Sequence, residues 1–286
     1  MNEYIIMTDT GCDLPAEMIE SLGLRVIRLE LNIEGEENST KNVEVKDFYG
    51  LLRAGKKATT SAVGIDRFMS AMEPILKEGK DILYLGFSSG LSGTYNAGFV
   101  AASEIAEKYP DRKIYTVDTL AASMGQGLLV YLAANKKADG ASIEDVRDFV
   151  ENNKLNMCHW FTVDDLMFLK RGGRINAATA VMGTMLSIKP VLHVDNDGKL
   201  ISISKARGRK AAIDALCAKL GETGTDLTEQ TVFISHGDCI DDATYLANKI
   251  KEKYSVKDVI IGFIGPVIGA HAGPGTLAVF YLGTHR

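Results

Sequence analysis

Hydroxyl side chains gather in one glycine-rich loop that links a predicted buried strand to a predicted helix. The strand is expected over residues 82–87 and the helix from residue 95 onward, and the loop between them contains Ser88-Ser89-Gly90-Leu91-Ser92-Gly93. Three hydroxyls and several backbone N–H groups would therefore lie at the positive end of a helix dipole, without any charged side chain. This combination is suited to binding a carboxylate or a phosphate.

The same loop contains a G-x-S-x-G pattern at residues 86–90, which is the pattern of the nucleophile elbow in α/β-hydrolases. A Ser88 triad would need His271 and either Asp118 or Asp238. In an elbow the helix begins directly after the nucleophile, whereas here four more loop residues intervene. A serine esterase or thioesterase that uses Ser88 or Ser92 with His271 is therefore kept as the alternative hypothesis.

Two further segments carry groups that could bind an anion. The hydroxyl run at residues 59–61 precedes a predicted helix over 65–76, and it is either an N-cap cluster or part of a site. His271 lies in a glycine-rich loop over 265–276, where the backbone can approach a ligand closely. A neutral imidazole there could donate a hydrogen bond to a carboxylate, or it could merely cap a backbone carbonyl.

Basic side chains are concentrated in the second half of an otherwise acidic chain. A solvated surface is the ordinary interpretation of such a group, and a docking face for an acidic or phosphate-bearing partner is the sharper one. The basic residues are Lys170, Arg171, Arg174, Lys205, Arg207, Arg209 and Lys210.

Composition and spacing argue against several classes of function. A net charge of -5 and the lack of a nucleic-acid motif argue against nucleic-acid binding. Neither a P-loop nor a dinucleotide-binding pattern is present, and the five histidines and four cysteines lack metal-ligand spacing, so we expect no metal and no cofactor. The first residues lack a basic signal segment, and the apolar run over 177–188 is shorter than the roughly 20 residues that a bilayer requires. We therefore expect a cytoplasmic protein without stable membrane insertion.

Strands and helices alternate through the first half of the chain, and these elements must position the polar loops. Strands are predicted over 4–7, 25–33, 82–87 and 113–117, and Asp13 is expected to cap a helix that begins at Pro15. Such alternation is typical of a mostly parallel sheet with helices on both faces, which binds ligands at the carboxyl ends of its strands.

The pattern changes near residue 155. Short strands, a hairpin and fewer helices follow, which indicates a second domain of the α+β class. The sequence therefore predicts an α/β fold in which an N-terminal α/β/α domain, residues 1–155, precedes a C-terminal α+β domain, residues 156–286, with a ligand between them. The strands and hairpin of the second domain are predicted over 160–163, 191–204, 231–235, 259–264 and 277–282.

Six motifs in order along the chain resemble the DegV family of bacterial lipid-binding proteins, which includes the fatty-acid-binding subunits of fatty acid kinase. The family usually has Thr-Ser-x-Pro-Ser, whereas here Ala62-Val63-Gly64 follows Thr60-Ser61. The motifs are Thr8-Asp9 with Asp13-Leu14-Pro15; Thr60-Ser61; Ser88-Ser89 with Leu91-Ser92-Gly93-Thr94-Tyr95; Leu169 with Arg171-Gly172-Gly173-Arg174-Ile175; Lys189-Pro190; and Gly265-Pro266 with Gly269, His271 and Gly273-Pro274-Gly275-Thr276.

The resemblance implies a site for one long-chain fatty acid between two domains. It implies that Thr60 and Ser92 hold the carboxylate with help from Ser61, Gly93 and His271. It also implies that the protein is not itself an enzyme and needs no cofactor, because a separate fatty acid kinase catalytic subunit would phosphorylate the bound carboxylate to an acyl-phosphate.

The turn that contains Arg171 and Arg174 resembles the part that the family uses near its kinase partner. For the lipid tunnel, the apolar segments 177–186 and 259–268 are candidate walls, although core packing would explain both of them equally well.

Overall fold

The computed structural model describes residues 3–36, 43–176 and 188–286, and the structural statements that follow concern these residues. Their strands form three sheets, of four, six and two strands. The strands are β1 (Tyr4–Asp9), β2 (Arg25–Ile27), β3 (Glu30–Ile33), β4 (Ala58–Ser61), β5 (Asp81–Gly86), β6 (Ile114–Asp118), β7 (Met157–Thr162), β8 (Ile188–Val194), β9 (Leu200–Arg207), β10 (Thr231–His236), β11 (Asp258–Phe263) and β12 (Leu277–Leu282).

Helices flank these sheets and separate the two larger ones. The helices are α1 (Ala16–Ser21), α3 (Val45–Arg53), α4 (Ile65–Lys77), α5 (Thr94–Ala106), α6 (Met124–Ala138), α7 (Ile143–Asn153), α8 (Met167–Arg171), α10 (Arg209–Thr223), α11 (Ile240–Tyr254) and α12 (Pro266–Ala272).

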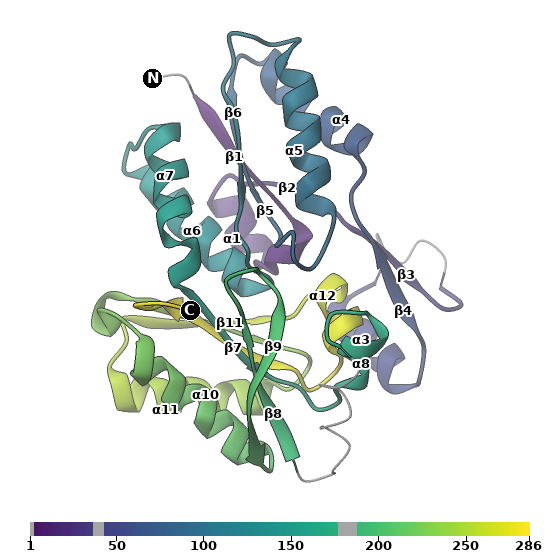
Figure 1. The fold of residues 1–286 in the computed structure, drawn as a ribbon, viewed down its shortest axis with the longest axis vertical. Helices are drawn as coiled ribbons and strands as arrows, with labels where there is room; N and C mark the ends of the chain where they lie inside the picture. The colour runs from purple at the N-terminus through teal and green to yellow at the C-terminus, as the bar shows by residue number, and fades with distance from the viewer. Residues whose placement is uncertain (1–2, 37–42, 177–187) are drawn as a thin grey trace.

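The four-stranded sheet has the order β2-β1-β5-β6, and every pair in it is parallel. Helices α4 and α5 cover one face, and α6 and α7 cover the other (Figure 1). Every residue of the central strand β5 is buried, because apolar side chains point to both covered faces. The predicted parallel sheet with helices on both faces is therefore confirmed.

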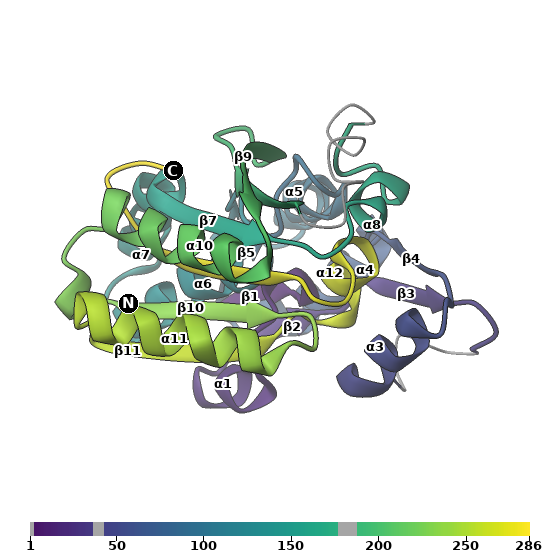
Figure 2. The same ribbon diagram turned by 90° about the horizontal axis from the view of Figure 1, so that it is seen from below.

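The six-stranded sheet has the order β11-β10-β12-β7-β8-β9 and is mostly antiparallel. Helices α10 and α11 lie against its outer face (Figures 1 and 2), while α6 contacts its inner face as well as the four-stranded sheet. One apolar core therefore joins the two sheets through α6. The predicted fold class is confirmed, and the predicted domain boundary between residues 155 and 156 stays a prediction.

The predicted single strand over 25–33 is wrong, because the chain leaves the four-stranded sheet in the middle of it. The N–H of Leu29 donates to Oγ1 of Thr10, 3.0 Å away, between β2 and β3. Strand β3 then pairs with β4 as a separate two-stranded sheet. The N-cap interpretation of residues 59–61 is also wrong, because these residues lie in β4 and Gly64 is the N-cap of α4.

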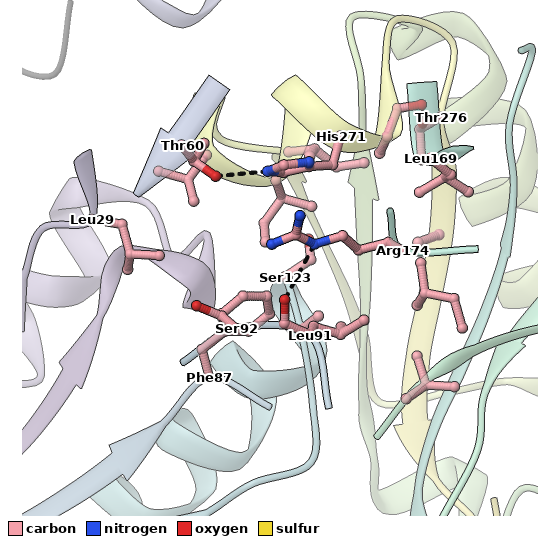
Figure 3. Close-up of a pocket in the computed structure, with 18 of the residues that line it drawn as sticks. Leu29, Thr60, Phe87, Leu91, Ser92, Ser123, Leu169, Arg174, His271 and Thr276 are labelled. Carbon is pink, nitrogen blue, oxygen red and sulfur yellow. Dashed lines mark hydrogen bonds between the residues drawn. The ribbon is translucent and has the colours of Figure 1, made fainter. Parts of the chain in front are cut away.

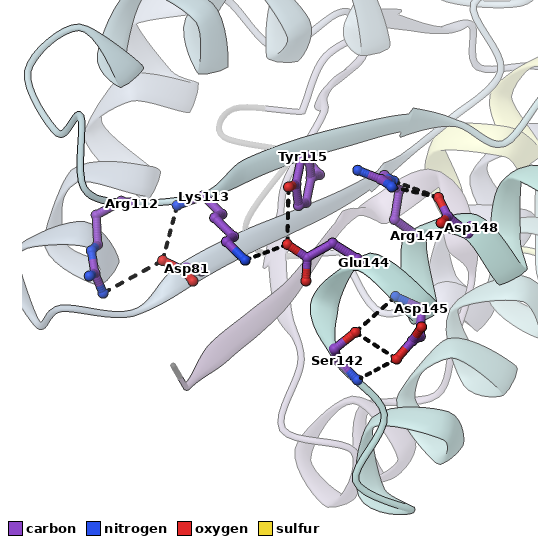
Figure 4. A network of polar contacts seen from close by, with 9 residues as sticks. All are labelled: Asp81, Arg112, Lys113, Tyr115, Ser142, Glu144, Asp145, Arg147 and Asp148. Atoms are coloured by element: carbon purple, nitrogen blue, oxygen red, sulfur yellow. Dashed lines mark hydrogen bonds and ion pairs between the residues drawn. The ribbon is translucent and has the colours of Figure 1, made fainter. Parts of the chain in front are cut away.

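A polar network ties β5, β6 and α7 together at the amino end of the four-stranded sheet (Figure 4). The buried carboxylate of Asp81 accepts the N–H of Lys113, and Glu144 pairs with the Lys113 ammonium. Ser142 and Asp145 form a capping box at the start of α7. The network fixes the amino ends of these strands, and their carboxyl ends lie at the opposite edge of the sheet.

The predicted apolar helix over 177–186 lies outside the described residues. Across the described ranges, no helix is both long enough and apolar enough to span a membrane.

Candidate functional site

A cavity lies beyond the carboxyl end of β5, lined by loops that follow strands of the four-stranded sheet and by strands of the six-stranded sheet (Figure 3). The cavity has a volume of about 170 Å³, whereas a single water needs only about 10–15 Å³. Most of its wall is apolar, which is suited to an elongated hydrocarbon. The apolar lining includes Leu29, Phe87, Leu91, Phe161, Leu169, Val194, Leu200, Ala278 and Phe280.

All five residues that were predicted to hold a carboxylate line this same cavity. They are Thr60, Ser61, Ser92, Gly93 and His271. Oγ1 of Thr60 lies 2.7 Å from Nε2 of His271, so β4 and α12 meet at this polar end. The structure therefore brings the predicted set together, and the role of the set in binding a carboxylate stays a prediction.

Hydrogen bonds to two acids fix the loop that carries Ser92. The Asp9 carboxylate accepts the N–H of Phe87 at 2.9 Å, and Asp118 accepts the N–H of Ser89 at 3.2 Å. These acids at the strand ends therefore position the loop. The Ser92 hydroxyl lies 2.9 Å from Oγ1 of Thr94, at the start of α5, where the helix dipole is positive.

His271 is neutral at pH 7. Burial and the nearby Arg174 cation lower its pKa to about 4. A side chain at Gly172 would overlap Nδ1 of His271, so the glycine allows α8 to approach the imidazole closely. A neutral imidazole has one N–H and one lone pair. Nε2, which faces Thr60, can therefore donate a hydrogen bond to an oxygen or accept one from a hydroxyl.

The two arginines predicted to dock a partner lie in different places. Arg171 is exposed, and its guanidinium lies over the ring of Phe168. Arg174 instead lines the cavity, where its Nε donates to the carbonyl of Leu91 at 3.2 Å (Figure 3). Burial lowers the pKa of Arg174, and no described carboxylate forms an ion pair with it. The sequence analysis assigned Arg174 to partner docking and did not predict its place in the cavity wall. The adjacent Gly173 adopts φ 71°, and a glycine there is compatible with a sharp turn of the chain.

A Ser88 triad is not assembled among the described residues. Ser88 is buried and donates to the carbonyl of Gly198 at 2.8 Å, while His271 is paired with Thr60. Asp118 binds loop N–H groups, and Asp238 forms an ion pair with an arginine of α3. Within the described ranges, no three His, Cys, Asp or Glu side chains are grouped to hold a metal ion.

The predicted wall segment 259–268 contributes only its last part to the cavity. Ile264, Val267 and Ile268 line it, whereas the residues of β11 pack elsewhere. The lining from β7, β12 and the start of α6, including Ser123, was missed. Alternate side chains of a buried strand face different layers, and an all-apolar strand does not indicate which of its faces borders a cavity.

A family model and a curated relative both match this chain over nearly its full length. The family described as "Uncharacterised protein, DegV family" matches residues 4–284. A DegV domain-containing protein from Clostridium perfringens is 49% identical, with 99% of this chain and 98% of that protein covered.

Two solved structures are similar over the whole chain. One, described as showing fatty acid binding of a DegV family protein from Thermus thermophilus, is 30% identical, with a TM-score of 0.87 and coverage of 99% of this chain and 100% of that one. The other, a hypothetical protein from Thermotoga maritima described as revealing a fatty acid binding function, is 31% identical, with a TM-score of 0.84 and the same coverage.

Proposed function

The chain belongs to the DegV family, and we propose that it binds one long-chain fatty acid and presents the carboxylate to a separate kinase. The observation that carries this proposal is the polarity of the cavity. Its interior is mostly apolar, while hydroxyls, an imidazole and the Arg174 guanidinium gather at one end. The cavity would lie between domains that we place at residues 1–155 and 156–286.

Thr60 and Ser92 would hold the carboxylate, with help from Ser61, Gly93 and His271. Hydroxyl donors leave a carboxylate oxygen able to accept a phosphoryl group, whereas an arginine fork would occupy both oxygens. Arg174 already donates from Nε and from a terminal nitrogen to backbone carbonyls. It would therefore add charge attraction without presenting these two groups as a fork.

The hydrocarbon tail would supply most of the affinity. At about 0.8 kcal/mol per buried CH₂, a chain of roughly fifteen methylenes contributes on the order of 10 kcal/mol before the costs of ordering. The apolar wall formed by β7, β9 and β12 matches such a ligand in character.

The polar end lies near the surface, which suits presentation to a partner. Ser61 and Gly93 are exposed, and Thr60, Ser92 and His271 are half-buried. A carboxylate held there would have one side within reach of a kinase catalytic subunit in the cytoplasm. The exposed Arg171 is our candidate contact for that partner, and the carrier itself would need no cofactor.

Native mass spectrometry of the purified protein tests the binding. A co-purifying mass in the range of long-chain fatty acids supports the proposal, and the absence of any lipid after incubation with oleate or palmitate would contradict it. Addition of a fatty acid kinase catalytic subunit and ATP tests the second part, because acyl-phosphate should form only in the presence of both proteins.

A further inference from the structure

A serine outside the G-x-S-x-G pattern occupies a strained turn at the start of a helix. Ser123 is the N-cap of α6 with φ 53° and ψ -146°, a conformation that side chains other than glycine rarely adopt. In α/β-hydrolases the nucleophilic serine occupies a strained strand-to-helix turn of this kind. Ser88 has no such setting, because the helix after it begins only at Thr94.

A half-buried acid lies directly behind this serine. Ser123 Oγ donates to Oδ2 of Asp13 at 2.7 Å and lies 3.0 Å from Oγ of Ser235. Burial raises the pKa of Asp13 to about 7, against the opposing effect of hydrogen bonds from Ser123 and from the backbone of Gly265. A carboxylate with a pKa near 7 is well matched to accept a proton from a hydroxyl at neutral pH.

Both members of this pair depart from ordinary backbone geometry. Asp13 has φ 51°, as Ser123 has φ 53°, although 110 positions separate them. Strained residues of this kind persist only where the surrounding structure holds them, and they are concentrated at functional sites. Two such residues that meet through one short hydrogen bond are therefore a pair that the fold has fixed in place.

Ser123 also lines the lipid cavity. Its neighbour Ser235 is paired with Ala278 across β10 and β12, and Ala278 lies in the cavity wall. Ser123 therefore borders the cavity beside Ala278, deeper along β12 than Thr276 is. An acyl chain that extended inward along β12 toward Phe280 would bring a carbonyl group beside Ser123, with its leaving group toward Thr60 and Arg174.

We propose that Ser123 and Asp13 form a nucleophile and general base that cleave acyl esters held in this cavity. The inference rests on the proposed function in one respect, that the cavity accepts an acyl chain. Ser123 Oγ bonds to the ester carbonyl carbon while Asp13 takes the hydroxyl proton. The bond from carbon to the alcohol oxygen then breaks, and Asp13 returns the proton to that oxygen. Water releases the fatty acid from Ser123 by the same two steps, with Asp13 again as the base.

Two probes test the pair in the full-length protein. An alkyl fluorophosphonate should form an Oγ–phosphorus bond with release of fluoride, and peptide mass spectrometry should locate the adduct on Ser123. Hydrolysis of p-nitrophenyl decanoate gives the rate. Ser123→Ala should abolish both labelling and hydrolysis, and Asp13→Asn should lower the rate by a factor on the order of 10² or more. Ser88→Ala is the matched control and should leave both unchanged.

Fatty acid retention, measured on every variant by native mass spectrometry, separates this inference from the proposed function. Wild-type protein that retains fatty acid without labelling at Ser123 would overturn the inference and leave the lipid-binding proposal intact. Labelled wild-type protein that retains no fatty acid would overturn the lipid-binding proposal alone. A Ser123→Ala variant that keeps its lipid and its unfolding temperature but loses hydrolysis supports the inference, because a purely structural role predicts that these properties change together.

Discussion

Nε2 of His271 lies 2.7 Å from Oγ1 of Thr60, although 211 positions separate the two residues. The contact joins the two-stranded sheet β3–β4 to helix α12 at the polar end of the cavity. The contact is also close to the half-buried cation of Arg174, which contributes to the low pKa of the imidazole.

Loss of one head-group hydroxyl should weaken fatty acid binding. Hydrogen bonds to charged groups contribute about 1.5–3 kcal/mol each, so Thr60→Val or Ser92→Ala should raise the Kd by roughly 10- to 150-fold. Isothermal titration with palmitate measures the change. Ser103→Ala is the control, because Ser103 is exposed on α5 and donates only to the backbone of its own helix. If both head-group variants bind as tightly as wild type, the carboxylate lies elsewhere.

Substitution of Arg174 and substitution of Arg171 should affect different properties, namely lipid affinity and acyl-phosphate formation. Arg174→Gln removes the cation from the cavity and should lower affinity for fatty acid by about tenfold or more, since a half-buried charge interacts strongly with an anion. Arg171→Gln should leave that affinity unchanged and should lower the rate of acyl-phosphate formation with the kinase. Titration and a coupled kinase assay on both variants decide the matter. An equal loss of lipid binding in both would show that the structural distinction between them has no functional meaning.

The pH dependence of the unfolding free energy should reflect the titration of His271. Its folded pKa of about 4 lies below the ordinary value of 6.5, so the unfolded chain takes up a proton first as the pH falls. As the pH falls from 6.5 to about 4, the titration of His271 therefore lowers the free energy of unfolding. Urea unfolding of wild type and His271→Gln should show a difference in unfolding free energy that moves in favour of the variant across this range. A difference that is constant with pH would contradict the low pKa.

Binding of a fatty acid should raise the pKa of His271. A carboxylate beside the imidazole offsets the Arg174 cation and favours the protonated ring. The ring resonances in a nuclear magnetic resonance titration should therefore shift at higher pH in the lipid-bound protein than in the lipid-free protein. Identical titrations in both states would place the carboxylate away from His271.

Chain-length preference should respond to the wall at β12. Ala278→Leu would occupy room for about two methylenes, which corresponds to roughly 1.6 kcal/mol or about a 15-fold loss of affinity for a long chain. Shorter fatty acids should be affected less, and a competition assay across chain lengths measures the shift. Val279→Leu is the control, since its side chain packs on the opposite face of the strand in the core with α10 and α11. A uniform loss for all chain lengths would contradict this placement of the tail.

The sequence predicts the alternating fold well, because that fold depends on local patterns. The five head-group residues, which were named from a family resemblance, do line one cavity, and their role in binding a carboxylate stays a prediction. The role of Asp13 was predicted from its neighbours in sequence alone, and that prediction is wrong. Asp13 was expected to cap the helix after it, yet Pro15 is the N-cap of α1 and the Asp13 carboxyl instead accepts the hydroxyl of Ser123. The break between β2 and β3 has the same origin, since it depends on Thr10 accepting the N–H of Leu29. Such partners are distant in the chain and leave no local pattern.

The two-stranded sheet β3–β4 has a thermodynamic consequence for the lipid-free protein. Two strands alone are marginally stable in water, so this sheet depends on its packing against α3 and α12. We expect it to open locally at a lower free energy than the two larger sheets, with faster amide hydrogen exchange. Because Thr60 lies on it, a bound carboxylate would stabilise the closed sheet by mass action. Lipid occupancy and local folding of this segment would then be a single coupled equilibrium.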